Sequence, residues 1–171
     1  TPDMMCLGKA FASFLPMGAT LVTDEVFDAF RGGKGAALYY GHTFCGNPLG
    51  AAVAREVLAV FRDEDVLGQV RRAAPRIEAS MASLVGTPGV ARTRALGMIG
   101  AVDLTSPCED EATGYLSDLG WRVYDEARRR GAYLRPLGST VYLCPPLTLS
   151  EGELGELLSI FTESIRAVGG R

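Results

Sequence analysis

Lysine and histidine are scarce in this sequence, and the long apolar runs of membrane proteins are missing. Its 171 residues contain only two lysines, Lys9 and Lys34, and one histidine, His42. No apolar stretch approaches the roughly 20 residues that a transmembrane helix needs. The formal net charge is −3, and the arginines at 128–130 are the nearest approach to a basic run. We therefore expect small-molecule substrates and neither a nucleic-acid nor a membrane partner.

Paired cysteines are missing as well. The four cysteines are far apart and form no CxxC motif: Cys6, Cys45, Cys108 and Cys144. A single histidine adds little to such a set, so we expect free thiols, no metal site and a cytoplasmic location. Hydrophobic residues make up 47% and charged residues 22%, which is typical of a soluble globular protein with a core.

Short apolar runs and helical patterns alternate in the first half of the chain. Residues 4–7 and 19–22 are apolar and bounded by glycine or proline, which predicts two short buried strands. Asn47-Pro48 predicts a helix start, because asparagine caps helices and proline suits their first position. The helical period is interrupted at residues 63–65 and then resumes, with Pro75 predicting a kink or a restart.

The second half combines strands with amphipathic helices. Residues 98–104 predict a strand. Residues 132–135 and 140–143 predict two more, joined through Gly138-Ser139. Ser150 and Glu153 form a capping box that starts the last helix.

Lys9 is the first candidate for chemistry. It directly follows a predicted buried strand, whereas Lys34 lies in a glycine-rich loop. Apolar surroundings lower the pKa of a lysine and make its neutral amine available to form a Schiff base. The alternative is a surface lysine whose stem lies along apolar neighbours.

A second candidate is the segment 40–48, which ends at the predicted helix start. The hydroxyl group of Thr43 and the backbone N–H groups ahead of the helix suit a phosphate. His42 suggests either acid–base chemistry or, as we favour, packing and hydrogen bonding. We include it among the residues that contact substrate.

A third candidate is the predicted hairpin around Gly138-Ser139. A turn centred there puts Arg135 opposite Tyr142, with both side chains on one face. A guanidinium and a phenol together can bind a carboxylate. The alternative is an arginine that forms an ordinary surface ion pair.

Three separated motifs together resemble one family. Met4-Met5-Cys6-Leu7-Gly8-Lys9-Ala10, Pro16-Met17-Gly18-Ala19-Thr20 and Gly41-His42-Thr43-Phe44-Cys45-Gly46-Asn47-Pro48-Leu49 resemble the class III aminotransferases in order and spacing. These are fold-type-I enzymes that use pyridoxal 5'-phosphate. The resemblance implies the carboxy-terminal part of that α/β fold. Residues 1–69 would end the large cofactor-binding domain, and residues 70–171 would form a small α+β domain.

The resemblance also implies roles for the candidate residues. Lys9 would be the catalytic lysine that binds the cofactor, and Thr43 would bind the cofactor phosphate of the neighbouring subunit in a homodimer. Arg135, with Tyr142 beside it, would hold the carboxylate of an oxo-acid substrate. The site would therefore lie at a subunit interface.

Two departures from the family pattern stand out. Phe11-Ala12-Ser13-Phe14 replaces the usual Thr/Ser-Gly-Gly stretch and is one residue shorter. The acidic partner of the pyridine nitrogen lies upstream of the lysine in the family, so Asp24-Glu25 is not that group. Two alternatives stay open: another ω-aminotransferase of the family, and a non-catalytic chain that keeps the fold for dimerisation.

Overall fold

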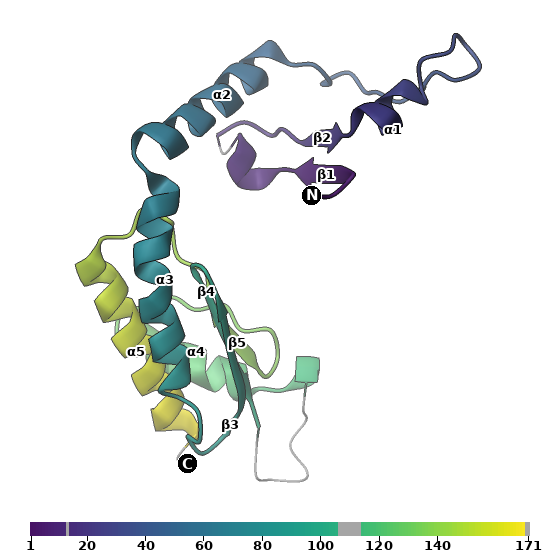
Figure 1. Ribbon diagram of the computed structural model, residues 1–171. Helices are drawn as coiled ribbons and strands as arrows, with labels where there is room; N and C mark the ends of the chain where they lie inside the picture. Colours follow the sequence, from purple (N-terminus) through teal and green to yellow (C-terminus); the bar gives the residue numbers. More distant parts are fainter. Residues whose placement is uncertain (13, 106–113, 170–171) are drawn as a thin grey trace. The chain divides into compact units, whose positions relative to one another are not determined.

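The computed structural model describes residues 1–12, 14–105 and 114–169. Their contacts divide the chain into two compact units, Thr1–Asp65 and Val66–Arg171, each with a sheet of its own (Figure 1). Within the described ranges, no helix is both long and apolar enough to cross a bilayer. The domain boundary expected after residue 69 falls inside helix α3 (Val66–Ala82), the first helix of the second unit.

The first unit contains the two short strands that the sequence predicts. β1 (Met4–Leu7) pairs antiparallel with β2 (Ala19–Val22), so that Leu7 lies opposite Ala19. The prediction that both are buried is wrong, because almost all of their residues are exposed or half-exposed. A two-stranded sheet cannot bury both of its faces with the short helices around it.

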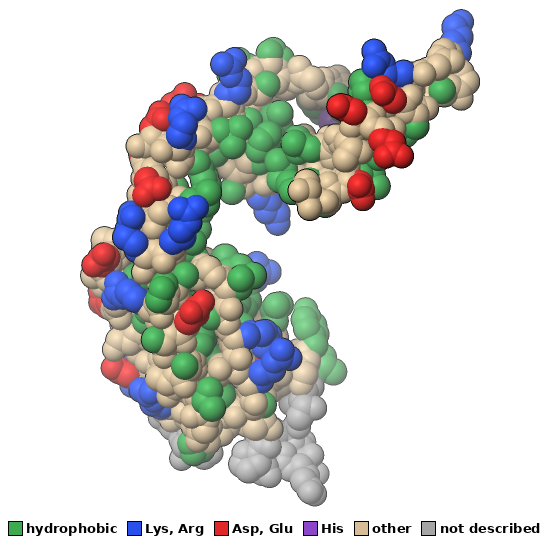
Figure 2. All heavy atoms as spheres, viewed as in Figure 1, with side chains coloured by type: hydrophobic (Ala, Val, Ile, Leu, Met, Phe, Trp, Pro, Cys, Tyr) green, Lys and Arg blue, Asp and Glu red, His purple; other side chains and the backbone are tan. Residues whose placement is uncertain are grey.

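Three helical segments complete this unit: η1 (Lys9–Phe11), a single 3₁₀ turn, α1 (Asp24–Asp28) and α2 (Pro48–Asp63). The predicted start of α2 is confirmed, since Asn47 Oδ1 accepts a hydrogen bond from the Leu49 N–H at 3.0 Å. Hydrophobic side chains remain exposed beside α2 (Figure 2), and the most exposed of the unit are Phe14, Tyr39, Tyr40, Phe44 and Leu49. So large an apolar surface is typical of an interface rather than of a free surface.

The second unit is an antiparallel sheet covered by helices. The strand order is β3 (Val90–Leu96), β4 (Ile99–Leu104), β5 (Thr140–Leu143). The helices are α3, α4 (Leu119–Arg129) and α5 (Glu151–Gly169), with a 3₁₀ turn, η2 (Gly114–Leu116), ahead of α4. One core lies between the sheet and the helices and includes Ile77, Val102, Val123, Val141 and Phe161, none of which exposes any surface.

The predicted capping box at the start of α5 is confirmed. The Ser150 N–H donates to Glu153 Oε2 at 2.9 Å, and Ser150 Oγ accepts from the Glu153 N–H at 3.3 Å. A kink or a restart was predicted at Pro75, and α3 runs through it as one helix, without a restart. The cost of the proline, about 3 kcal/mol, is offset by a helix face that buries Ile77 and Met81 in the core.

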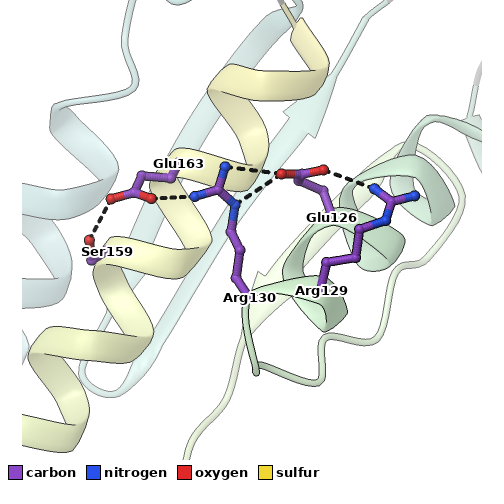
Figure 3. Close-up of polar contacts among 5 residues, drawn as sticks. All are labelled: Glu126, Arg129, Arg130, Ser159 and Glu163. Carbon is purple, nitrogen blue, oxygen red and sulfur yellow. Dashed lines mark hydrogen bonds and ion pairs between the residues drawn. The ribbon is translucent and has the colours of Figure 1, made fainter.

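Arg130, directly after α4, joins that helix to α5. Its guanidinium donates to Glu126 on α4 and to Glu163 on α5, and Ser159 donates to Glu163 at 2.9 Å (Figure 3). The hydrogen bond from Arg130, and after it the one from Arg129, lower the pKa of the Glu126 carboxyl. These contacts fix the two helices against each other behind the sheet.

Candidate functional site

Lys9 lies at the end of β1, in a backbone conformation that side-chain-bearing residues rarely adopt. Its φ angle is +52°, and the only other positive φ at a non-glycine residue in the described part of the chain is at Asp65. Hydrogen bonds on both sides hold the turn: the Phe11 N–H donates to Gly8 O and the Ala12 N–H to Lys9 O, both at 3.2 Å. Left-handed backbone costs an L-residue about 1–2 kcal/mol, and such strain gathers at functional sites.

The apolar surroundings expected for Lys9 are absent in this chain, where its side chain is exposed. The strand that precedes it is uncovered as well, for the reason given above. In the segment 11–14, which differs from the family pattern, Ala12 is fully buried and Phe14 is 88% exposed. Ser13 lies outside the described residues. Lys34 lies in the loop after α1, where its carbonyl accepts from the Tyr39 hydroxyl at 2.8 Å.

His42 and Cys45 form a tight turn ahead of α2. The Cys45 N–H donates to His42 O at 2.9 Å, and the Phe44 N–H donates to His42 Nδ1 at 3.2 Å. The imidazole is therefore a hydrogen-bonding residue of the turn, which leaves Nε2 for other partners. Thr43 lies between these contacts and is exposed, so its hydroxyl is accessible just ahead of the helix.

A cavity of about 350 Å³ lies beside this turn, within the first unit. His42, Phe44 and Cys45 line it together with residues 16–18 and the first turn of α2. Thr43 is not among the lining residues. Residues of the second and third sequence motifs therefore line one cavity.

The second unit has a cavity of about 340 Å³ that brings Arg135 and Tyr142 together. The turn at Gly138-Ser139 is present, closed by a bridge between Leu137 and Thr140. The prediction of a strand at 132–135 is wrong, since these residues form neither a strand nor a bridge. Pro136 has no N–H to donate, and it restricts the residue before it.

The composition of this cavity is mixed. Apolar side chains supply most of its wall, including Leu134, Leu143, Pro145 and Leu157, and Arg135 supplies its permanent positive charge. A guanidinium at the edge of an apolar hollow suits a carboxylate that carries an aliphatic chain.

Sequence reasoning missed two features of these sites. The left-handed backbone at Lys9 has no signature in a single sequence beyond its position after Gly8. The second feature is a polar contact on the open face of the second sheet, where Asp103 accepts from both Arg94 and Thr140. The available signal was a lone Asp103 in the otherwise apolar β4, together with Thr140 and Tyr142 at alternate positions of β5.

A protein-family model for class III aminotransferases matches residues 1–165, which include every motif discussed above. The chain belongs to the class III aminotransferase family. Fold-type-I transferases are also its structural relatives, which confirms the expected fold class. The family's enzymes depend on pyridoxal phosphate.

Curated relatives carry several names within this family. The chain is 38% identical to the adenosylmethionine-8-amino-7-oxononanoate aminotransferase of Geobacter sulfurreducens, over 99% of this chain and 38% of that protein. It is 32% identical to the probable gamma-aminobutyrate transaminase 4 of Oryza sativa, over 99% of this chain and 36% of that protein. The chain thus spans well under half the length of these relatives.

Solved structures agree in fold. The adenosylmethionine-8-amino-7-oxononanoate aminotransferase of Methanocaldococcus jannaschii superposes with a TM-score of 0.86 at 32% identity, over 98% of this chain and 39% of that one. An amine transaminase from an uncultivated Pseudomonas species, in its PLP-bound form, gives a TM-score of 0.85 at 32% identity, over 97% of this chain and 38% of that one.

The residues present fit pyridoxal phosphate. The cofactor needs a primary amine for its aldehyde and hydrogen-bond donors for its phosphate. Lys9 offers an exposed amine at a strand end, and Thr43 offers a hydroxyl ahead of a capped 16-residue helix. Helix amino termini favour anions through their free N–H groups and dipole.

In the described part of the chain, Cys6, Cys45 and Cys144 are free thiols, and Cys108 lies outside it.

Proposed function

We propose that this chain is the carboxy-terminal part of a cytoplasmic, pyridoxal-phosphate-dependent aminotransferase in which Lys9 binds the cofactor. The observation that carries the proposal is the left-handed backbone at Lys9, within the first of the three motifs that the family shares. Glycine adopts this conformation without strain, whereas lysine adopts it at a cost in backbone energy. Lysine at such a position is explained by a need for its amine.

Bound pyridoxal phosphate supplies an electron sink for the chemistry at the substrate's α-carbon. Lys9 Nζ holds the cofactor in place and, once released, moves the proton from that carbon as a general base. Thr43 donates its hydroxyl to the phosphate in the site of a second subunit. The exposed apolar surface beside α2 supports an interface there, both with that subunit and with the rest of the polypeptide.

We further propose that the amino acceptor is a monocarboxylate with an aliphatic chain. Arg135 binds its carboxylate, Tyr142 lies beside it, and the apolar wall of the cavity takes the chain. The names of the relatives favour one reaction: transfer from S-adenosylmethionine to 8-amino-7-oxononanoate, giving 7,8-diaminononanoate in biotin biosynthesis. His42 is the remaining candidate for substrate contact, through its free Nε2.

A donor screen tests this proposal. The full-length protein is loaded with pyridoxal phosphate and given 8-amino-7-oxononanoate with S-adenosylmethionine, 4-aminobutyrate or 1-phenylethylamine in parallel. Mass spectrometry should find 7,8-diaminononanoate with S-adenosylmethionine. The rice relative motivates the second candidate, another ω-aminotransferase, and turnover of 4-aminobutyrate or the amine alone would favour it. A protein that binds no pyridoxal phosphate would instead be a non-catalytic, dimer-forming member of the fold.

A further inference from the structure

The turn that precedes β5 is held by backbone hydrogen bonds within it and to two neighbouring elements. Leu137 and Thr140 exchange two of them, at 2.8 and 3.0 Å. The Ser139 N–H donates to Gly114 O at 2.9 Å, and Ser139 O accepts from the Leu104 N–H at 2.8 Å. The turn is therefore tied to β4 on one side and to η2 on the other.

Close backbone packing restricts this turn on the sides that face Gly114 and Gly120. A Cβ atom on Gly138, whose φ is +57°, would lie 2.1 Å from the carbonyl oxygen of Gly114. A Cβ atom on Gly120, at the start of α4, would lie 2.2 Å from Gly138 O. Both positions thus require glycine, since the opposing atoms are backbone and cannot move aside cheaply.

Side-chain hydrogen bonds on the open face of the sheet also hold the turn. Thr140 Oγ1 donates to Asp103 Oδ1 at 2.7 Å, and Arg94 donates to the other carboxylate oxygen. The register pairs Asp103 with Thr140 and Ala101 with Tyr142. Because side chains alternate along a strand, Asp103, Thr140 and Tyr142 share one face.

Arg135 depends on this turn for its position. It lies two residues before the Leu137–Thr140 bridge, and Tyr142 lies two residues after it. The two side chains face the same cavity because the turn folds one segment back on the other. A shift of the turn would therefore change the separation of the guanidinium from the phenol.

We propose that Asp103 and Thr140 are positioning residues for the carboxylate site, which they align by fixing the turn that carries Arg135. This inference rests on the proposed role of Arg135. Neither residue touches substrate. Their contribution is to the geometry of a bidentate hydrogen bond, which tolerates little displacement.

The test uses two near-isosteric changes in the full-length holoenzyme. Thr140→Val removes only the hydroxyl, and Thr140→Ser keeps it. The substrates are 8-amino-7-oxononanoate and its methyl ester, which has no carboxylate. Thr140→Val should raise the KM for the free acid about fivefold, which corresponds to the loss of one of the two hydrogen bonds from Arg135 to the carboxylate. The kcat and the KM for the ester should stay near the parent values, and Thr140→Ser should match the parent. Asp103→Ala provides a second variant and should act as Thr140→Val does.

A double-mutant cycle with Arg135→Ala separates positioning from general stability. In the Arg135→Ala background, Thr140→Val should have no further effect on the KM for the acid. Equal losses with acid and ester, or additive effects in the cycle, would overturn the inference. If Arg135→Ala itself leaves the KM for the acid unchanged, the proposed acceptor site is wrong. If Arg135→Ala raises that KM and Thr140→Val does not, only the positioning role is wrong.

Discussion

The strained backbone at Lys9 can be tested by comparing Lys9→Gly with Lys9→Ala. Both changes remove the amine, so both should abolish transamination. They differ in backbone energy, because glycine adopts a φ of +52° without strain and alanine does not. Relief of left-handed strain contributes about 1–2 kcal/mol, and the greater freedom of unfolded glycine offsets about 0.5–1 kcal/mol of it. Lys9→Gly should therefore be the more stable variant by about 0.5–1 kcal/mol.

Hydrogen exchange measures this difference locally. The amides of Phe11 and Ala12 donate to the carbonyls of Gly8 and Lys9, so their exchange reports opening of this turn. In the cofactor-free protein they should exchange roughly two to five times more slowly in Lys9→Gly than in Lys9→Ala. Asp65, with a φ of +48°, is the matched control. Asp65→Gly should likewise be more stable than Asp65→Ala, and both variants should keep their transaminase activity. Equal exchange in the two Lys9 variants would refute strain at this site.

Three other changes address the remaining sites. Thr43→Val should raise the dissociation constant of pyridoxal phosphate about tenfold, whereas Thr43→Ser should not; equal affinity in all three proteins contradicts the phosphate role. Arg135→Ala should weaken binding of the oxo acid by about 2–5 kcal/mol and raise its KM roughly 30-fold or more. The KM in Arg135→Lys should lie between those of the parent and Arg135→Ala, and the KM for the methyl ester should not change. The pKa of Asp103 is lowered, chiefly by the hydrogen bond from Arg94. The ionised Asp103 therefore stabilises the fold above the ordinary pKa of an aspartate, and this stabilisation is lost as the pH falls through the pKa that Asp103 has in the folded protein. Urea midpoints should therefore fall more below about pH 4 in the parent than in Asp103→Asn, and parallel curves would contradict this.

Local signals in the sequence predicted the helix starts well. Asn47 and the Ser150–Glu153 box act on backbone groups within three residues, so no distant part of the chain is needed to form them. The positions of the two short strands and of the turn at Gly138-Ser139 also followed from local breakers. The three motifs then identified the family, and the fold with it.

Features that depend on distant segments could not be predicted in this way. Residues 132–135 alternate as a strand does, yet they pair with no strand, and the single bridge of this segment lies beyond Pro136, at Leu137. Burial of β1 depends on elements that must cover it, and its own four residues say nothing about them. The contact of Asp103 with Thr140 requires the register of β4 against β5, which is set by the whole sheet. Lys9 was a candidate from its position in the sequence, and the resemblance gave it a role, but its backbone conformation came only from the structure.

The lysine that binds the cofactor can be identified by chemical labelling, because the chain has only two lysines. The full-length protein is loaded with pyridoxal phosphate, reduced with borohydride, digested, and its peptides are mapped by mass spectrometry. We expect a pyridoxyl label on Lys9 and no label at this position in Lys9→Ala. A label on Lys34, or no label within these 171 residues, would contradict it.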